Sequence, residues 1–128
     1  PRACDALLAH LKPIHPGSSL NAIRHVTLAL EALGDPRAAS ALATCLKQKG
    51  LHGFAVSDPR TLPPQGGYGL GPEMDNCLRE LALARALIAC GDHEGLARRT
   101  FEAYARDPRG VLTAHAKAVL GAYPAGRR

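Results

Sequence analysis

The chain has 128 residues, of which 46% are hydrophobic and 21% charged, and its formal net charge is +5. A chain of this length forms one domain with a real core, and these fractions are near the averages of globular proteins. No apolar run approaches the roughly 20 residues that a membrane helix needs, so we expect no membrane segment. The four cysteines lack paired spacing and indicate a reducing compartment, so we expect a cytoplasmic protein.

Composition indicates an all-α fold. Ala dominates the apolar residues, Trp is absent, and Val and Ile are few. Ala and Leu favour helices, whereas strands are enriched in β-branched and aromatic residues. We therefore expect a single domain of antiparallel helical hairpins.

The first half of the chain predicts three helices, over residues 3–11, 19–33 and 36–49. Ser18 or Ser19 caps the second helix, whose apolar residues recur at steps of three and four. Gly34 supplies a left-handed residue at its end, Asp35 accepts from free N–H groups, and Pro36 suits a first helical position. The second and third helices are therefore antiparallel neighbours.

Residues 51–71 form a long loop in this prediction, because they contain five Gly and three Pro and show no sustained period. Such connections are usually either functional or disordered. The stretch GGYGLG at 66–71 precedes a helix start but lacks the Lys-Ser/Thr of a phosphate-binding loop, so we interpret it as a linker. If it binds a partner, Tyr68 is its most usable contact, since it offers a flat face and a hydroxyl.

The second half predicts helices over 73–90, 93–106 and 109–121. Gly91-Asp92 separates the first two of these, as Gly34-Asp35 separates an earlier pair 57 residues before. One hairpin cannot bury its apolar face alone, whereas stacked hairpins can. The spacing exceeds the usual repeat of about 40–47 residues, and the loop at 51–71 accounts for the surplus.

Residues 29–46, ALEALGDPRAASALATCL, resemble a HEAT-like repeat of the phycobilisome-lyase type. The shared features are an Ala/Leu helix, a Leu-Gly-Asp-Pro-Arg hinge and a second Ala/Leu helix. The resemblance implies a short α-solenoid of about six helices that acts as a scaffold or protein-interaction module. The second copy departs from this pattern, with Cys90 for Leu and His93-Glu94 for Pro-Arg.

Residues 81–120 resemble the helical segment at the end of some bacterial FAD-dependent oxidoreductases. This resemblance implies an alternative, an accessory helical domain of a larger enzyme whose flavin site lies elsewhere. Gly67-Tyr68-Gly69 begins a dinucleotide fingerprint, but Pro72 occupies the place of its third Gly and no strand precedes it.

We expect no catalytic, cofactor-binding or metal-binding residues in this chain. No two of the six His have HExxH spacing, and no two of the four Cys have CxxC spacing, so the cysteines are interpreted as small buried hydrophobes. Asp92 and Glu94 are explained by capping of a helix start, and the Asp-Pro-Arg triplets at 35–37, 58–60 and 107–109 likewise.

The expected partner is a protein or a neighbouring domain. Candidate contacts are Tyr68, Arg98 and Arg99, and exposed end helices would favour a homodimer. A nucleic-acid-binding helical repeat is a further alternative, but the basic residues are scattered, so we expect no nucleic acid. That alternative requires one basic surface made by five arginines: Arg24, Arg79, Arg85, Arg98 and Arg99.

Overall fold

The computed structural model describes residues 2–58, 60 and 72–124. In these residues the chain forms six α-helices and one short 3₁₀ helix and has no strand, which confirms the all-α class. Four of the six helices lie within one residue of their predicted bounds. The helices are α1 Arg2–Leu11, α2 Leu20–Leu33, α3 Ala39–Leu46, α4 Pro72–Ala89, α5 Leu96–Ala105 and α6 Gly110–Ala122.

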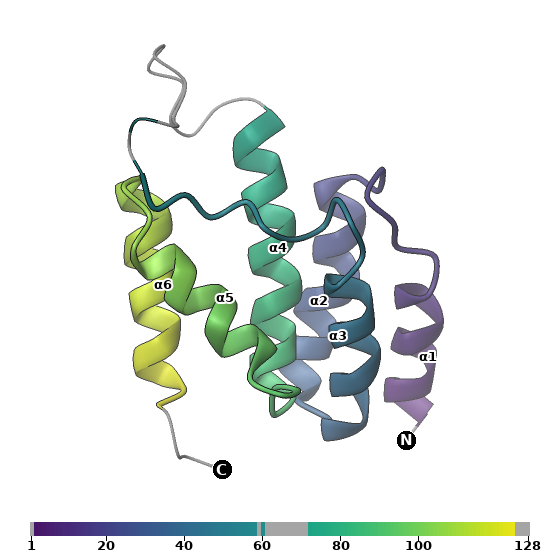
Figure 1. The fold of residues 1–128 in the computed structure, drawn as a ribbon. Coiled ribbons are helices and arrows are strands. Elements are labelled where there is room, and N and C mark those ends of the chain that lie inside the picture. The colour runs from purple at the N-terminus through teal and green to yellow at the C-terminus, as the bar shows by residue number, and fades with distance from the viewer. Residues whose placement is uncertain (1, 59, 61–71, 125–128) are drawn as a thin grey trace.

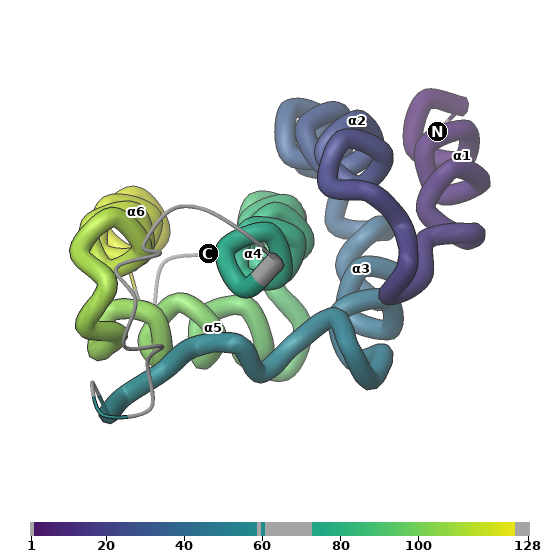
Figure 2. Tube along the Cα trace, turned by 90° about the horizontal axis from the view of Figure 1, so that it is seen from above, coloured from purple at the N-terminus to yellow at the C-terminus, as the bar shows by residue number. Residues whose placement is uncertain are grey.

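The helices lie in two layers around α4. Helices α2, α4 and α6 form one layer and run in the same direction, while α3 and α5 form the other (Figures 1 and 2). Helix α4 packs closely against α2, α3 and α5, whereas the close packing of α6 is with α5. Helices α2 and α6 therefore stand on either side of α4.

The hinge between α2 and α3 forms largely as the sequence predicts. Ser19 caps α2 by accepting from the Ala22 N–H at 3.1 Å, and Gly34 ends it in the left-handed region at φ 61°. The Asp35 side chain accepts from the Arg37 N–H at 3.0 Å. Helices α2 and α3 run antiparallel, but each packs more closely against α4 than against the other.

The predicted third helix, 36–49, is wrong at both ends. Pro36 begins a 3₁₀ helix, Pro36–Ala38, and the α-helix itself spans Ala39–Leu46. After Leu46 the chain turns, because the Gln48 side-chain amide donates to the distant Ile14 carbonyl at 3.0 Å and Gly50 adopts φ 98°. A tertiary hydrogen bond thus ends a helix that the local pattern would continue.

The predicted start of the fifth helix at residue 93 is also wrong, because α5 begins at Leu96. Asp92 and Glu94 adopt positive φ values of 64° and 54°, between two glycines that do the same. Asp92 still caps the helix, since its carboxylate accepts from the N–H groups of Ala97 at 2.8 Å and Arg98 at 3.1 Å.

The core runs through both layers and contains all four cysteines as free thiols. Burial raises the pKa of Cys45 and of Cys90 to about 11. These thiols stay protonated near neutral pH and act as small apolar groups, as the sequence predicts.

The connection after α3 leaves that helix and passes α4 toward the start of α6 (Figure 1). We call residues 51–58 the strap. It contains neither helix nor strand, in line with the predicted loop, and Leu51 at its start is fully buried. The rest of the predicted loop, except Arg60, lies outside the described residues.

Candidate functional site

Side chains of α2, α4 and α6 line a groove that has α4 at its base. Figure 2 shows α4 lying between α2 and α6. Its volume is about 380 Å³. Apolar side chains from all three helices line it, among them Leu28 of α2, Leu81 of α4 and Val111 of α6. We call this hollow the α2–α4–α6 groove; its charged and titratable lining residues are Arg24, Glu31, Arg85 and His115.

The sides of this groove are exposed although its base is buried. Leu28 is 58% exposed and Val111 67%, whereas Leu81 is 3% exposed. The groove stays open because α6 packs closely against α5 and not against α4. Two large apolar side chains therefore stand uncovered on opposite sides of an apolar base.

The charged residues that line the groove differ in whether they form an ion pair. Arg85 and Glu31 form an ion pair with Nε to Oε2 at 3.0 Å. Arg24, one turn before Leu28 on α2, has no ion-pair partner among the described residues. Burial, and next the Arg85 charge, lowers the pKa of His115, so this imidazole is neutral near pH 7. Arg24 is thus the uncompensated charge of the groove.

On the opposite side of α4, the buried Glu80 holds the strap. Its carboxylate accepts from the N–H groups of Gly53 at 2.9 Å and Phe54 at 3.1 Å. It also accepts from the buried Tyr104 hydroxyl at 2.6 Å. Burial, with the adjacent carboxylate, raises the pKa of Tyr104, so its hydroxyl remains a donor. All three of these hydrogen bonds come from donors in the chain itself.

Asp107 and Arg109 hold the same strap from the turn before α6. Their ion pair joins Asp107 Oδ2 to Arg109 Nη2 at 2.7 Å. The Asp107 side chain is 0% exposed and the Arg109 side chain 7%. Asp107 accepts from the Val56 N–H at 2.8 Å, and Arg109 donates to the Phe54 carbonyl at 3.0 Å. Burial alone would raise the pKa of Asp107, but the hydrogen bonds from Arg109 and Val56 lower it overall.

The three Asp-Pro-Arg triplets make the same local pair in different settings. In each, the Arg N–H donates to the Asp carboxylate two residues before it, and the guanidinium pairs with the same group. The Asp35 pair and the Asp58 pair are partly exposed, whereas the Asp107 pair is buried against the strap. The local pair is the same in all three triplets. Only its burial against the strap makes the Asp107–Arg109 pair an anchor of the strap.

The polar network is fully satisfied. Every buried side-chain nitrogen and oxygen in residues 2–58, 60 and 72–124 has a hydrogen-bond partner. Within the same residues, no three His, Cys, Asp or Glu come together in a way that would hold a metal ion. The buried groups Glu80, Asp107 and Tyr104 all face other parts of the chain, and none of them lines the α2–α4–α6 groove.

A second, larger hollow of about 1030 Å³ lies between the start of α3, the turn at 91–95 and the end of α6. Arg98 lines it and donates to the Tyr123 carbonyl, and Arg99 donates to the Glu94 carbonyl at 2.6 Å. Glu94 is 71% exposed in its side chain and lies 3.6 Å from Lys47. Both predicted arginine contacts are therefore engaged with backbone carbonyls, Arg98 with one at the end of α6 and Arg99 with one in the turn before α5.

The other predicted contacts are dispersed. Tyr68 lies outside the described residues. Arg24 and Arg85 line the α2–α4–α6 groove, whereas the Arg79 guanidinium donates to the Ser18 carbonyl at 3.0 Å. The five arginines thus do not gather in one hollow.

Sequence reasoning missed the groove and the strap anchors. Leu28 lies off the apolar stripe of its helix, and this position is the sequence signal of an exposed apolar residue. No local signal marks Glu80 as buried, because its partners lie 26 and 27 residues earlier in the chain.

Comparisons with family models, curated proteins and solved structures give no match to this chain. None of the helices described here is long and apolar enough to cross a membrane.

Proposed function

We propose that this chain is a non-catalytic helical module that binds another protein through the α2–α4–α6 groove. The observation that carries the proposal is the exposure of Leu28 and Val111 on the two sides of an apolar base. Large apolar side chains that frame one hollow are typical of a binding site, whereas scattered ones are not.

The rest of the molecule supports a binding role over a catalytic one. The buried carboxylates Glu80 and Asp107 hold the chain's own strap and are satisfied there. The HEAT-like resemblance of residues 29–46 points the same way, since stacked helices offer extended surfaces to partners. An apolar groove between helices can accept the apolar face of a helix, which is a common mode of peptide recognition.

The alternative role, an accessory domain of an FAD-dependent oxidoreductase, would use the same groove toward a neighbouring domain. The groove is also compatible with the predicted homodimer. The accessory-domain role and the homodimer differ in what occupies the groove, a neighbouring domain or a second copy of the chain. A catalytic role for the chain alone would not depend on Leu28.

The proposal is tested with a neutral helical peptide of about 15 residues that has one leucine face and glutamine elsewhere. We expect fluorescence anisotropy to detect binding to the whole chain. Leu28→Ser should weaken it about tenfold, because one apolar side chain no longer becomes buried.

The matched control is Leu33→Ser. Leu33 is an exposed leucine on the same helix, 43% accessible, and it does not line the groove. We expect this variant to bind like the wild type. Equal losses in the two variants, or no binding at all, would contradict the proposed function.

A further inference from the structure

We propose that the partner of the α2–α4–α6 groove is an amphipathic helix that carries a carboxylate one turn from its central apolar residue. This inference rests on the proposed function and names the chemistry of the occupant. It is carried by the charges of the groove, which are arranged asymmetrically around Leu28.

The asymmetry lies along α2. Arg24, Leu28 and Glu31 are spaced by four and three residues, so they follow one another along the same side of the helix. Glu31 is already paired with Arg85 at 3.0 Å. Arg24 lies at the other end of this row, without an ion-pair partner in the part of the chain that the structure describes.

The remaining groups around the groove do not neutralise Arg24. From α4 the charged lining residue is Arg85, and from α6 the titratable one is His115, which is neutral near pH 7. The whole chain carries a formal charge of +5. The complementary occupant is therefore apolar where it meets Leu28 and Val111, and negative where it meets Arg24.

A protein carboxylate fits this surface better than a phosphate polymer. Nucleic-acid binding rests on several phosphate contacts made by clustered basic residues. In the groove one arginine is unpaired and the other is held by Glu31, while most lining residues are apolar. A planar guanidinium next to an apolar base suits one Glu or Asp on a helix that buries its leucines.

Three peptides test this inference on the full chain. All share the leucine face of the neutral peptide; one carries two Glu, and another two Lys, one turn from the central leucine. We expect the Glu peptide to bind about fivefold tighter than the Lys peptide, the size expected for an exposed ion pair. The difference should shrink at high salt, because exposed charges are screened.

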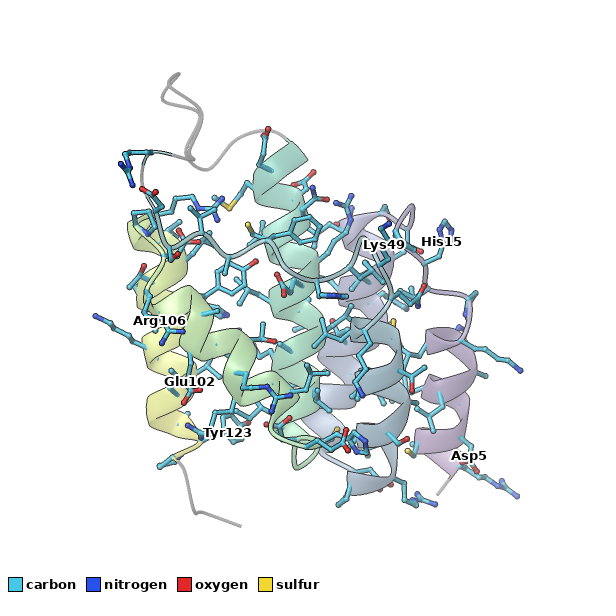
Figure 3. The ribbon with its side chains drawn as sticks, viewed as in Figure 1. Asp5, His15, Lys49, Glu102, Arg106 and Tyr123 are labelled. Atoms are coloured by element: carbon cyan, nitrogen blue, oxygen red, sulfur yellow. The ribbon has the colours of Figure 1, made fainter. Side chains whose placement is uncertain are left out.

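Charge reversal at Arg24 is the decisive variant. Arg24→Glu should invert the preference, so that the Lys peptide binds more tightly than the Glu peptide. Arg106→Glu is the matched control, since Arg106 is exposed on the C-terminal side of α5 and lies outside the groove (Figure 3). Arg24 is exposed, so both variants are expected to fold, and circular dichroism checks this.

The outcomes separate the inference from the proposed function. If all three peptides bind equally and all lose affinity in Leu28→Ser, the carboxylate inference is wrong and the groove remains a binding site. If Arg106→Glu shifts the preference as much as Arg24→Glu, net charge alone explains it and the inference is wrong. If no peptide depends on Leu28, both proposals fail.

Discussion

The two faces of α4 differ in what covers them. Toward α5 the chain covers itself: the strap lies there, and the carboxylates of Glu80 and Asp107 accept its N–H groups. Toward α2 and α6, Leu28 and Val111 remain 58% and 67% exposed. Buried polar groups on one face thus hold the chain's own segments together, while the other face leaves large apolar side chains exposed. Five measurements test this difference between the two faces, and the variant with the greatest expected loss of stability comes first.

Asp107→Asn should lower the free energy of unfolding by about 3 kcal/mol, because it leaves the buried Arg109 charge uncompensated. The matched change is Asp35→Asn, which alters the same Asp-Pro-Arg pair in a partly exposed setting, and we expect a clearly smaller loss. Urea unfolding measures both. Equal losses would show that the strap adds nothing to the Asp107 pair.

The effect of Asp107 should depend on pH. The pKa of Asp107 is lowered in the folded protein, so its contribution is complete above the ordinary value of 3.8 and disappears as the pH falls through the folded value. The stability difference between wild type and Asp107→Asn should therefore be large near neutral pH and shrink below about pH 4. A constant difference would contradict this assignment.

Glu80→Gln should lower the free energy of unfolding by about 2 kcal/mol, since an amide replaces a charged acceptor of three hydrogen bonds. Glu102→Ala is the control; Glu102 lies on α5 and is exposed (Figure 3), so its effect should stay within about 0.5 kcal/mol. Urea unfolding again provides the measurement. A neutral Glu80→Gln would mean that the strap contributes little to stability.

Cys77 should report local opening of the strap. Its thiol is buried and lies 3.7 Å from the Phe54 carbonyl, whereas Cys90 lies beside α2, with its thiol 3.5 Å from the Leu30 carbonyl. In Glu80→Gln we expect Cys77 to react with a thiol reagent about tenfold faster under native conditions, with Cys90 unchanged. Peptide mass spectrometry locates the label. Faster labelling of both would indicate global unfolding.

Leu28→Ser should change the free energy of unfolding by less than about 0.5 kcal/mol, because the side chain is largely exposed. Together with its expected effect on peptide binding, this would separate binding from stability at one residue. Thermal unfolding of Leu28→Ser measures this change, and Leu33→Ser is unfolded in parallel as the control. A loss as large as that of Glu80→Gln would show that Leu28 belongs to the core.

The sequence was informative where the determinants are local. Ser19, Gly34 and Asp35 act on neighbouring backbone groups, so the ends of α2 could be predicted from the chain. The end of α3 and the start of α5 could not, because one depends on a contact to Ile14 and the other on positive φ values at Asp92 and Glu94.

The candidate site was less predictable than the helices. The α2–α4–α6 groove exists because α6 packs on α5, which no spacing within one helix reveals. The strap anchors depend on pairs far apart in the chain, such as Val56 with Asp107. The predicted contact at Tyr68 remains a prediction.

The strap has a consequence for how the two halves of the chain hold together. It belongs to the N-terminal half, yet hydrogen bonds from Gly53 and Val56 reach Glu80 and Asp107 in the C-terminal half. Helices α2 and α3 also pack on α4. Noncovalent contacts thus hold the two halves together, in addition to the covalent connection between Arg60 and Pro72. Fragments 1–60 and 72–128 should therefore complement each other and co-elute as one complex in size-exclusion chromatography.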